Sequence, residues 1–166
     1  ALHCEDTKTI LANEKIAKNT YGDNVPFSMH GIIRSRDCCI KSTALAIQIA
    51  KETGARIHLM HLSTYQEVAM LKDLMYGNVK TRQISGEACI PHLYFSESFY
   101  AQKGPFLKCN PAVKTEKDRL ALVQALESGV ITTVGTDHAP HELSAKGNQY
   151  FKCASGLPSV QFSLLA

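Results

Sequence analysis

Short apolar runs alternate along the chain with longer segments in which apolar residues recur every three or four positions. The apolar runs occupy residues 1–4, 55–61, 81–89 and 130–134. Runs of this length that are rich in β-branched residues are typical of buried strands, whereas the longer period is that of an amphipathic helix. The sequence therefore predicts four strands, separated by helices at about residues 7–19, 37–53, 65–76 and 115–128.

The alternation of strands and helices predicts a parallel sheet whose strands are joined by helical crossovers. Four strands amount to about half of a (β/α)8 barrel, so we predict an α/β fold that forms a partial (β/α)8 TIM barrel. An open, doubly wound sheet is the main alternative, but no glycine-rich phosphate loop follows any strand. Since the chain begins at the end of a strand without methionine and stops inside an apolar stretch, we expect it to be a portion of a longer protein.

The second predicted strand carries two histidines on opposite faces. Strict alternation of side chains places Leu59 and His61 on one face and His58 and Met60 on the other. If His61 points into a site, His58 points towards the covering helices. We therefore expect His58 to be a core histidine.

Composition and charge narrow the class of protein. The chain has 166 residues, of which 45% are hydrophobic, and a formal net charge of +3. No apolar run reaches the roughly 18 residues of a membrane span, and no basic block supports binding to nucleic acid. The six cysteines form no C-x-x-C pair, and no export signal opens the chain, which together indicate reduced, mostly buried thiols in a cytoplasmic protein.

Two further segments have several interpretations. Arg34 and Arg36 follow a predicted loop, where a solvated surface is the favoured interpretation and contact with an anionic substrate is the alternative. Residues 142–156 are polar and contain glycine, which predicts a mobile loop. Pro158 then suits the first turn of a last helix.

Polar residues stand at or just after the carboxyl ends of all four predicted strands. These residues are His3, His61, Glu87 and Asp137. In (β/α)8 barrels the active site is assembled from that rim. The segment 136–141 adds two imidazoles to the carboxylate of Asp137, a set that suits metal binding or proton transfer. The alternative is a capped loop whose polar groups bond only to backbone, but the other histidine-bearing strand ends favour a site.

Five segments together resemble the amidohydrolase superfamily and, within it, the dihydroorotase family. They are His3-Cys4-Glu5-Asp6, His61-Leu62-Ser63-Thr64, residues 87–93, Lys108-Cys109-Asn110-Pro111-Ala112, and Thr136-Asp137-His138-Ala139-Pro140-His141. Their order and spacing match the second half of the family's barrel. The resemblance thus implies that residues 1–166 are the carboxyl-side half of the barrel domain. One departure is Pro91-His92, where many members have two adjacent histidines after proline, and it leaves the role of His92 open.

The resemblance implies a site with two zinc ions. Seven residues match functional positions of the family: His3 and His61 as ligands of one zinc, Asp137 as ligand of the other zinc and as catalytic proton shuttle, Asn110 and His141 as substrate contacts, and Gly156 and Leu157 as backbone lying against the substrate ring. The family's first-strand histidine pair, the arginine that follows it and the bridging lysine or aspartate all precede Ala1. We therefore expect the chain alone to hold a partial metal site and to be inactive.

The function implied by the resemblance is the zinc-dependent, reversible cyclisation of N-carbamoyl-L-aspartate to L-dihydroorotate in pyrimidine biosynthesis. Two alternatives remain: a non-catalytic scaffold subunit of aspartate carbamoyltransferase, and a sister cyclic amidohydrolase such as an allantoinase or dihydropyrimidinase. The presence of all three metal-binding positions favours an enzyme. Unpaired strand edges of a half-barrel should also drive self-association, so a second copy is the expected macromolecular partner.

Overall fold

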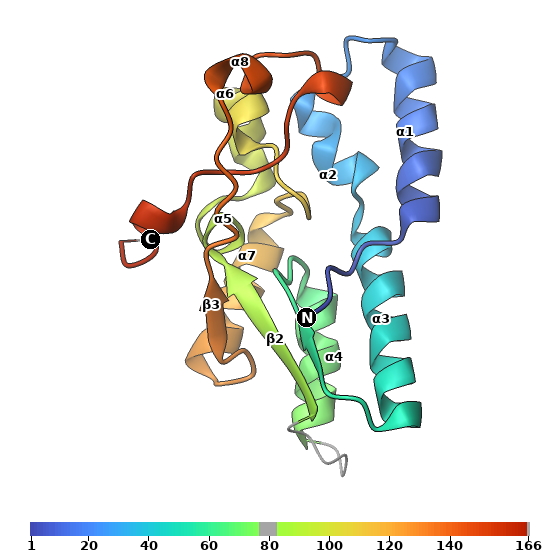
Figure 1. Cartoon of the computed structure of the whole chain (residues 1–166), viewed down its shortest axis with the longest axis vertical. Coiled ribbons are helices and arrows are strands. Elements are labelled where there is room, and N and C mark those ends of the chain that lie inside the picture. Colours follow the sequence, from blue (N-terminus) through green and yellow to red (C-terminus); the bar gives the residue numbers. More distant parts are fainter. Residues whose placement is uncertain (77–82, 166) are drawn as a thin grey trace.

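A parallel sheet forms the centre of the fold, and its strands follow chain order (Figure 1). The structure, a computed structural model, describes residues 1–76 and 83–165. The strands are β1 (Ile57–Leu59), β2 (Ile84–Cys89) and β3 (Thr133–Gly135), and β2 pairs in parallel with both neighbours. The predicted parallel α/β architecture is confirmed.

The first residues of the chain extend this sheet by a fourth segment. Leu2 forms a parallel bridge with Leu59, and its amide donates to the carbonyl of His58 at 2.8 Å. Because the other edge of β1 pairs with β2, Leu2 lies on the free side of β1. The expected strand end at residues 1–4 is therefore present as a short bridge.

Three long helices cover one face of the sheet. They are α3 (Arg36–Thr53), α4 (Tyr65–Tyr76) and α7 (Glu116–Glu127). Their apolar sides pack on the strands in one hydrophobic core. The core contains Ile47 from α3, Leu71 and Leu74 from α4, Leu122 and Ala125 from α7, and Leu59, Ala88 and Ile131 from the sheet region.

The remaining helices surround the carboxyl ends of the strands. Helix α1 (Thr7–Tyr21) is capped by the preceding residue, Asp6, whose carboxylate accepts from the amide of Thr9 at 3.0 Å. The shorter helices are η1 (Phe27–Met29), α2 (His30–Ile33), α5 (Ile90–Tyr94), η3 (Glu97–Phe99), α6 (Tyr100–Lys103), η4 (Gly104–Leu107), α8 (Leu143–Lys146), η5 (Tyr150–Lys152) and η6 (Val160–Phe162).

Several element boundaries differ from the prediction. The last strand, expected at 130–134, begins at Thr133, and the last helix, expected from Pro158, is only the single turn η6. The polar segment 142–156, expected to be a mobile loop, contains α8 and η5. The helix end expected at Gly77 and the first residues of the strand expected at 81–89 lie outside the described residues.

The expectation that His58 is a core histidine was wrong. Leu59 is fully buried in the helix-covered core, whereas His58 points to the opposite face, where its Nδ1 lies 2.8 Å from the hydroxyl of Ser85. The alternation argument failed because β1 ends at Leu59. His61 lies beyond the pleat with a positive φ of 36°, so its side chain does not share a face with Leu59 by alternation.

Both arginines that were expected at a solvated surface bind buried carboxylates instead. Arg34 donates to Glu5, and Arg36 donates through its two terminal nitrogens to Asp118 at 2.6 and 2.8 Å. The two carboxylate side chains are each 1% exposed.

All six cysteines are buried and unpaired, as predicted. Within the described residues, the helices are too short or too polar for a membrane span.

Candidate active site

Two of the predicted metal ligands meet at the carboxyl ends of neighbouring strands. Leu2 bridges to β1 and delivers His3, while His61 follows β1 by two residues. Nδ1 of His3 lies 2.8 Å from Nε2 of His61, and the ring planes are 76° apart. The sheet topology thus brings together two imidazoles that are 58 residues apart in sequence.

The backbone is strained at two of the predicted site residues. His61 has a φ of 36° and Asp137 a φ of 45°, and no other non-glycine residue of the described ranges has a positive φ. Such a conformation costs on the order of 1–2 kcal/mol per residue and persists only where the surroundings enforce it. Glu87 provides part of that constraint, because its backbone carbonyl accepts from Leu62 at 2.9 Å and its carboxylate from the amide of His61 at 3.4 Å.

Glu5 fixes the orientation of His3. Nε2 of His3 lies 2.9 Å from the Glu5 carboxylate, which also accepts from Arg34. Burial raises the pKa of Glu5, but the hydrogen bond from His3 and the charge of Arg34 outweigh it and hold that pKa below its ordinary value. Glu5 is therefore a carboxylate that accepts the Nε2 proton, which leaves the lone pair of His3 on Nδ1, the atom that faces His61.

His61 is held in its neutral form. Burial lowers the pKa of His61, and the neighbouring His3 lowers it further, while the charge of Asp137 acts in the opposite direction. A neutral imidazole is the form that binds a metal ion.

Two predicted site residues carry buried polar atoms with no partner. Nδ1 of His61 and Oδ1 of Asn110 are both inaccessible to solvent and make no hydrogen bond within the described residues. Buried polar atoms are almost always paired, so an orphan atom needs an explanation such as a missing ion or ligand. Asn110 precedes Pro111 through a cis peptide bond, at the end of the segment that follows η4.

The remaining predicted residues form a second group on the segment after β3. Nε2 of His141 donates to the carbonyl of Ser155 at 2.9 Å, and Ala139 donates to the carbonyl of Leu157 at 3.0 Å. Gly156 packs so closely on Ala139 that an added Cβ would lie 2.5 Å from the Cβ of that residue. His141, Gly156 and Leu157 are thus adjacent in space, as a shared subsite requires.

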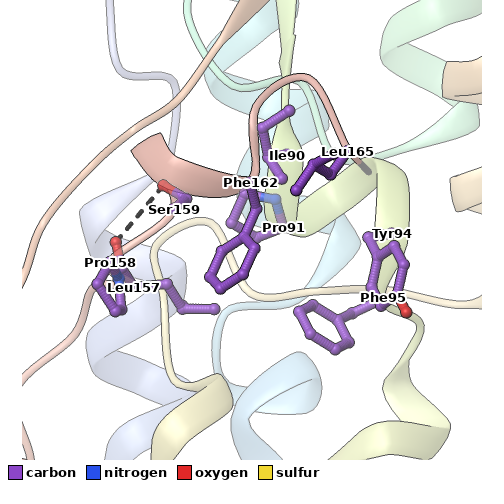
Figure 2. A pocket seen from close by; sticks show the side chains of 9 residues that line it. All are labelled: Ile90, Pro91, Tyr94, Phe95, Leu157, Pro158, Ser159, Phe162 and Leu165. Atoms are coloured by element: carbon purple, nitrogen blue, oxygen red, sulfur yellow. Dashed lines mark hydrogen bonds between the residues drawn. The ribbon is translucent and has the colours of Figure 1, made fainter.

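An apolar groove lies beside this group (Figure 2). It runs between α5 and the C-terminal segment and encloses about 330 Å³. Leu157 contributes to its wall, together with Pro91, Tyr94, Phe95 and Phe162. Its lining is almost entirely hydrocarbon, so a charged substrate would find few partners in it.

The donors present fit part of a metal site. Among the residues that the structure describes, no group of three or more His, Cys, Asp or Glu side chains is arranged to hold a metal ion. Two nitrogens on one tetrahedral zinc are separated by roughly 3.3 Å, given zinc–nitrogen distances of about 2.0–2.1 Å. The His3–His61 separation of 2.8 Å is close to that value, so a small shift of the rings, with the His61 proton on Nδ1 instead of Nε2, would let both lone pairs face one ion.

His92 and Arg34 have structural roles beside the site that the sequence analysis did not predict. His92 is buried, donates from Nε2 to the carbonyl of Pro111 at 2.8 Å, and so fixes the turn that follows Asn110. Burial lowers its pKa to about 4, which keeps it neutral. Arg34 acts on His3 only through Glu5, a link between distant segments that no local sequence signal reveals.

Comparison with curated proteins finds similar sequences among the dihydroorotases. The chain is 32% identical over 163 residues to a dihydroorotase of Methanosarcina mazei, which covers 96% of this chain and 35% of that protein. A dihydroorotase of Streptococcus pneumoniae is 32% identical over 119 residues, covering 71% of this chain and 28% of that protein. The chain spans about a third of the length of these relatives. No family model matches it.

Comparison with solved structures identifies the same fold. An L-hydantoinase (dihydropyrimidinase) from Arthrobacter aurescens matches with a TM-score of 0.88 at 22% identity, over 98% of this chain and 36% of that chain. A dihydroorotase from Saccharomyces cerevisiae, in complex with 5-fluoroorotic acid, matches with a TM-score of 0.64 at 24% identity, over 72% of this chain and 34% of that chain.

The parallel sheet and these matches define part of an amidohydrolase TIM barrel, and the chain belongs to the amidohydrolase superfamily. The predicted partial TIM barrel is thereby confirmed. Within the superfamily, its sequence is similar to that of the dihydroorotases.

Proposed function

We propose that this chain supplies part of the active site of a zinc-dependent dihydroorotase. The reaction would be the reversible cyclisation of N-carbamoyl-L-aspartate to L-dihydroorotate in cytoplasmic pyrimidine biosynthesis. The observation that carries the proposal is the 2.8 Å approach of His3 Nδ1 to His61 Nε2 at the carboxyl rim of the sheet. The sequence similarity to dihydroorotases supports the choice of substrate.

In this proposal His3 and His61 hold one zinc ion, and Asp137 contributes to the second. Bound zinc would polarise the amide carbonyl and make water a stronger nucleophile near neutral pH. The neutral state of His61 and the Nδ1 lone pair of His3 are the forms that such a site needs. The further ligands that the resemblance to the family implies would complete the set.

The other residues would bind the substrate and move a proton. Asp137 would accept the proton of the attacking water and deliver it to the ring nitrogen that leaves. The amide of Asn110 and the imidazole of His141 would bind the substrate carboxylate, and the orphan Oδ1 of Asn110 supports an additional contact with a ligand N–H. The backbone at Gly156 and Leu157 would lie against the ring.

The decisive experiment compares substrates. Because the chain spans about a third of the length of its relatives, the assay uses the full-length, zinc-loaded protein that carries this sequence. Loss of dihydroorotate is followed by ultraviolet absorbance, with allantoin and dihydrouracil assayed in parallel. Turnover of dihydroorotate alone is expected. Turnover of another ring would assign a sister cyclic amidohydrolase, and bound zinc without turnover of any ring would assign the scaffold role.

A substitution tests the proton shuttle. Asp137→Asn keeps the size of the side chain but removes its basicity, so turnover should fall by about a thousandfold or more while the fold is retained. Asp73→Asn, at an exposed position of α4, is the matched control. Unchanged turnover in Asp137→Asn would remove Asp137 from the mechanism.

A further inference from the structure

Two buried lysines meet at the segment that carries His141 and Gly156. Lys108 is 7% exposed and Lys146 is 5% exposed. Within the described ranges, neither ammonium group has a carboxylate oxygen within 4 Å. Burying a charged group costs free energy unless hydrogen bonds replace those that it made with water. The hydrogen-bond partners of the two ammonium groups therefore indicate their structural role.

Lys146 binds three main-chain carbonyls and no side chain. Its Nζ donates to the carbonyl of Lys108 at 3.1 Å and to those of Ala154 and Gly156 at 3.0 Å each. An ammonium group has three protons, so each of them has its own acceptor. Lys146 thereby ties together two segments that are about 46 residues apart, because Lys108 follows η4 and Ala154 follows η5.

Lys108 holds the turn that leads into the same segment. Its Nζ donates to the carbonyls of Tyr150 at 2.6 Å and Cys153 at 2.7 Å. The backbone carbonyl of Lys108 accepts from the amide of Gly156 at 2.8 Å as well as from Lys146. The path from Tyr150 to Gly156 is therefore fixed by main-chain contacts with two cations.

These contacts determine where the carbonyl of Ser155 points. Lys146 binds the carbonyls of Ala154 and Gly156, which flank Ser155. The carbonyl of Ser155 itself is not among the three acceptors of Lys146. That carbonyl accepts from Nε2 of His141 at 2.9 Å. Since a carbonyl only accepts, the Ser155 contact places a proton on Nε2 of His141, and a substrate carboxylate would be bound through Nδ1–H of the doubly protonated ring.

Gly156 leaves little freedom for any other arrangement. Its φ of 142° lies in a region that side chains rarely adopt, and an added Cβ would lie 2.6 Å from the carbonyl oxygen of Ala139. The segment must approach Ala139 closely to form the bridge between His138 and Leu157. A small displacement at Ala154 or Gly156 would therefore disturb the contact of His141 with Ser155 and the bridge between His138 and Leu157.

We propose that Lys146, assisted by Lys108, is a positioning residue that holds Ser155, Gly156 and Leu157 against His141 and so shapes the wall of the substrate site. The assignment of that wall to the substrate rests on the proposed function. An apolar side chain would fill the same space with a smaller desolvation cost, but it would not specify the direction of three carbonyls.

The test measures the local opening of the segment. Lys146→Met keeps the length of the side chain and removes the charge. Hydrogen exchange of the Gly156 and Ala139 amides, which donate to Lys108 and Leu157, should accelerate by about tenfold or more, while amides of β2 keep their wild-type rates. The ¹⁵N shift of His141 Nε2 should move towards that of a solvent-exposed imidazole.

Chemical rescue separates positioning from packing. Lys146→Ala removes the atoms of n-propylammonium, so that cation should restore slow exchange at Gly156, whereas n-propanol should not. Lys103→Met, at an exposed lysine of α6, is the control variant and should behave as wild type. If Lys146→Met does not fold, the rescue experiment alone decides. Exchange at Gly156 that is unaffected by the substitution, or rescued equally by n-propanol, would overturn the proposal.

The proposed function is examined separately by the substrate assay on the full-length protein. There, Lys146→Met should raise KM for dihydroorotate about tenfold or more with a much smaller change in kcat, since it displaces a binding wall and no reacting group. A protein that turns over another ring would refute the dihydroorotase assignment and leave the exchange result standing. Fast exchange at Gly156 combined with an unchanged KM would show that the segment is not part of the substrate site.

Discussion

Nδ1 of His3 lies 2.8 Å from Nε2 of His61, and the opposite nitrogen of His3 contacts the carboxylate of Glu5. The sheet therefore brings both imidazoles together at its carboxyl edge. The carboxylate of Glu5, itself bound by Arg34, selects the atom of His3 that faces His61. If His3 and His61 hold a zinc ion as proposed, the buried carboxylate of Glu5 should therefore influence how tightly that ion is bound.

The first prediction concerns that acid. Glu5→Ala should weaken zinc binding by the chain about 10–100-fold, because His3 would lose the group that fixes its tautomer and orientation. Calorimetric titration with zinc measures the effect, and Glu127→Ala, at an exposed position of α7, is the control. The prediction fails if Glu5→Ala binds zinc as tightly as the control does.

The second prediction concerns the pH dependence of stability. His30 is fully buried, with Nε2 donating to the carbonyl of Cys109 and Nδ1 accepting from the hydroxyl of Tyr150, both at 2.7 Å. Burial lowers the pKa of His30 to about 3 from an ordinary value of 6.5. Between these values the unfolded chain binds a proton that the folded chain does not. The stabilisation from neutral His30 is thus complete above pH 6.5 and is lost as the pH falls towards 3.

Urea unfolding between pH 7.5 and 4 measures this effect. One such proton gives a slope of up to about 1.4 kcal/mol per pH unit in the free energy of unfolding. His30→Asn should be less stable at pH 7.5 but should show a shallower fall with acid, and His138→Gln provides an exposed-histidine control. An equally steep fall in His30→Asn would mean that other groups cause the acid sensitivity.

The third prediction concerns the joint between α3, α4 and α7. The buried carboxylate of Asp118 accepts from Arg36, from the amide of Tyr65 at 2.9 Å and from Thr115, whose hydroxyl lies 2.6 Å away. Asp118→Ala leaves Arg36 without its partner and removes the capping box of α7, so the free energy of unfolding should fall by about 3 kcal/mol. Thermal and urea unfolding measure the loss.

Asp73→Ala is the matched control for this joint, because Asp73 is an exposed acid on α4. It should change stability by no more than about 0.5 kcal/mol. Should Asp118→Ala be as stable as Asp73→Ala, the Arg36–Asp118 contact would be a surface ion pair of little consequence.

Local periodicity was enough to predict the helices. It was not enough to predict which face of the sheet a side chain lies on, because that depends on pairing between segments that are distant in sequence. Helices α3 and α7 were found because their apolar residues recur with the helical period and lie in the core. His58 was assigned to the wrong face because pairing ends β1 at Leu59, two residues before His61. The end of a strand depends on the segments that pair with it, so the pattern of residues 55–61 alone does not show that β1 ends at Leu59.

The candidate site shows the same division. His3, His61 and Asp137 could be named because each follows an apolar strand, and the structure brings His3 into contact with His61. The partners of Arg34 and Lys146 could not be predicted, since Glu5 lies 29 residues from Arg34 and the carbonyls bound by Lys146 are main-chain atoms that carry no sequence identity. Long polar side chains look alike in sequence whether they meet solvent or a buried acceptor.

The last prediction concerns self-association through a strand edge. Among the described strands, β3 pairs with β2 alone, so its other edge presents free main-chain donors and acceptors. Val134 in β3 is 48% exposed, and Phe162 beside the apolar groove is equally exposed. A second copy of the chain could add its own strand to that edge and cover the adjacent apolar surface, so sedimentation should reveal concentration-dependent dimers.

Val134→Lys tests this edge directly, because a charge on an edge strand opposes pairing with another chain. The variant should sediment as a monomer at concentrations where the wild-type chain dimerises. Leu45→Lys introduces the same charge at an exposed apolar residue of α3 and should leave the dimer intact. A wild-type chain that stays monomeric at every concentration, or a Leu45→Lys variant that dissociates as readily as Val134→Lys, would contradict pairing through β3.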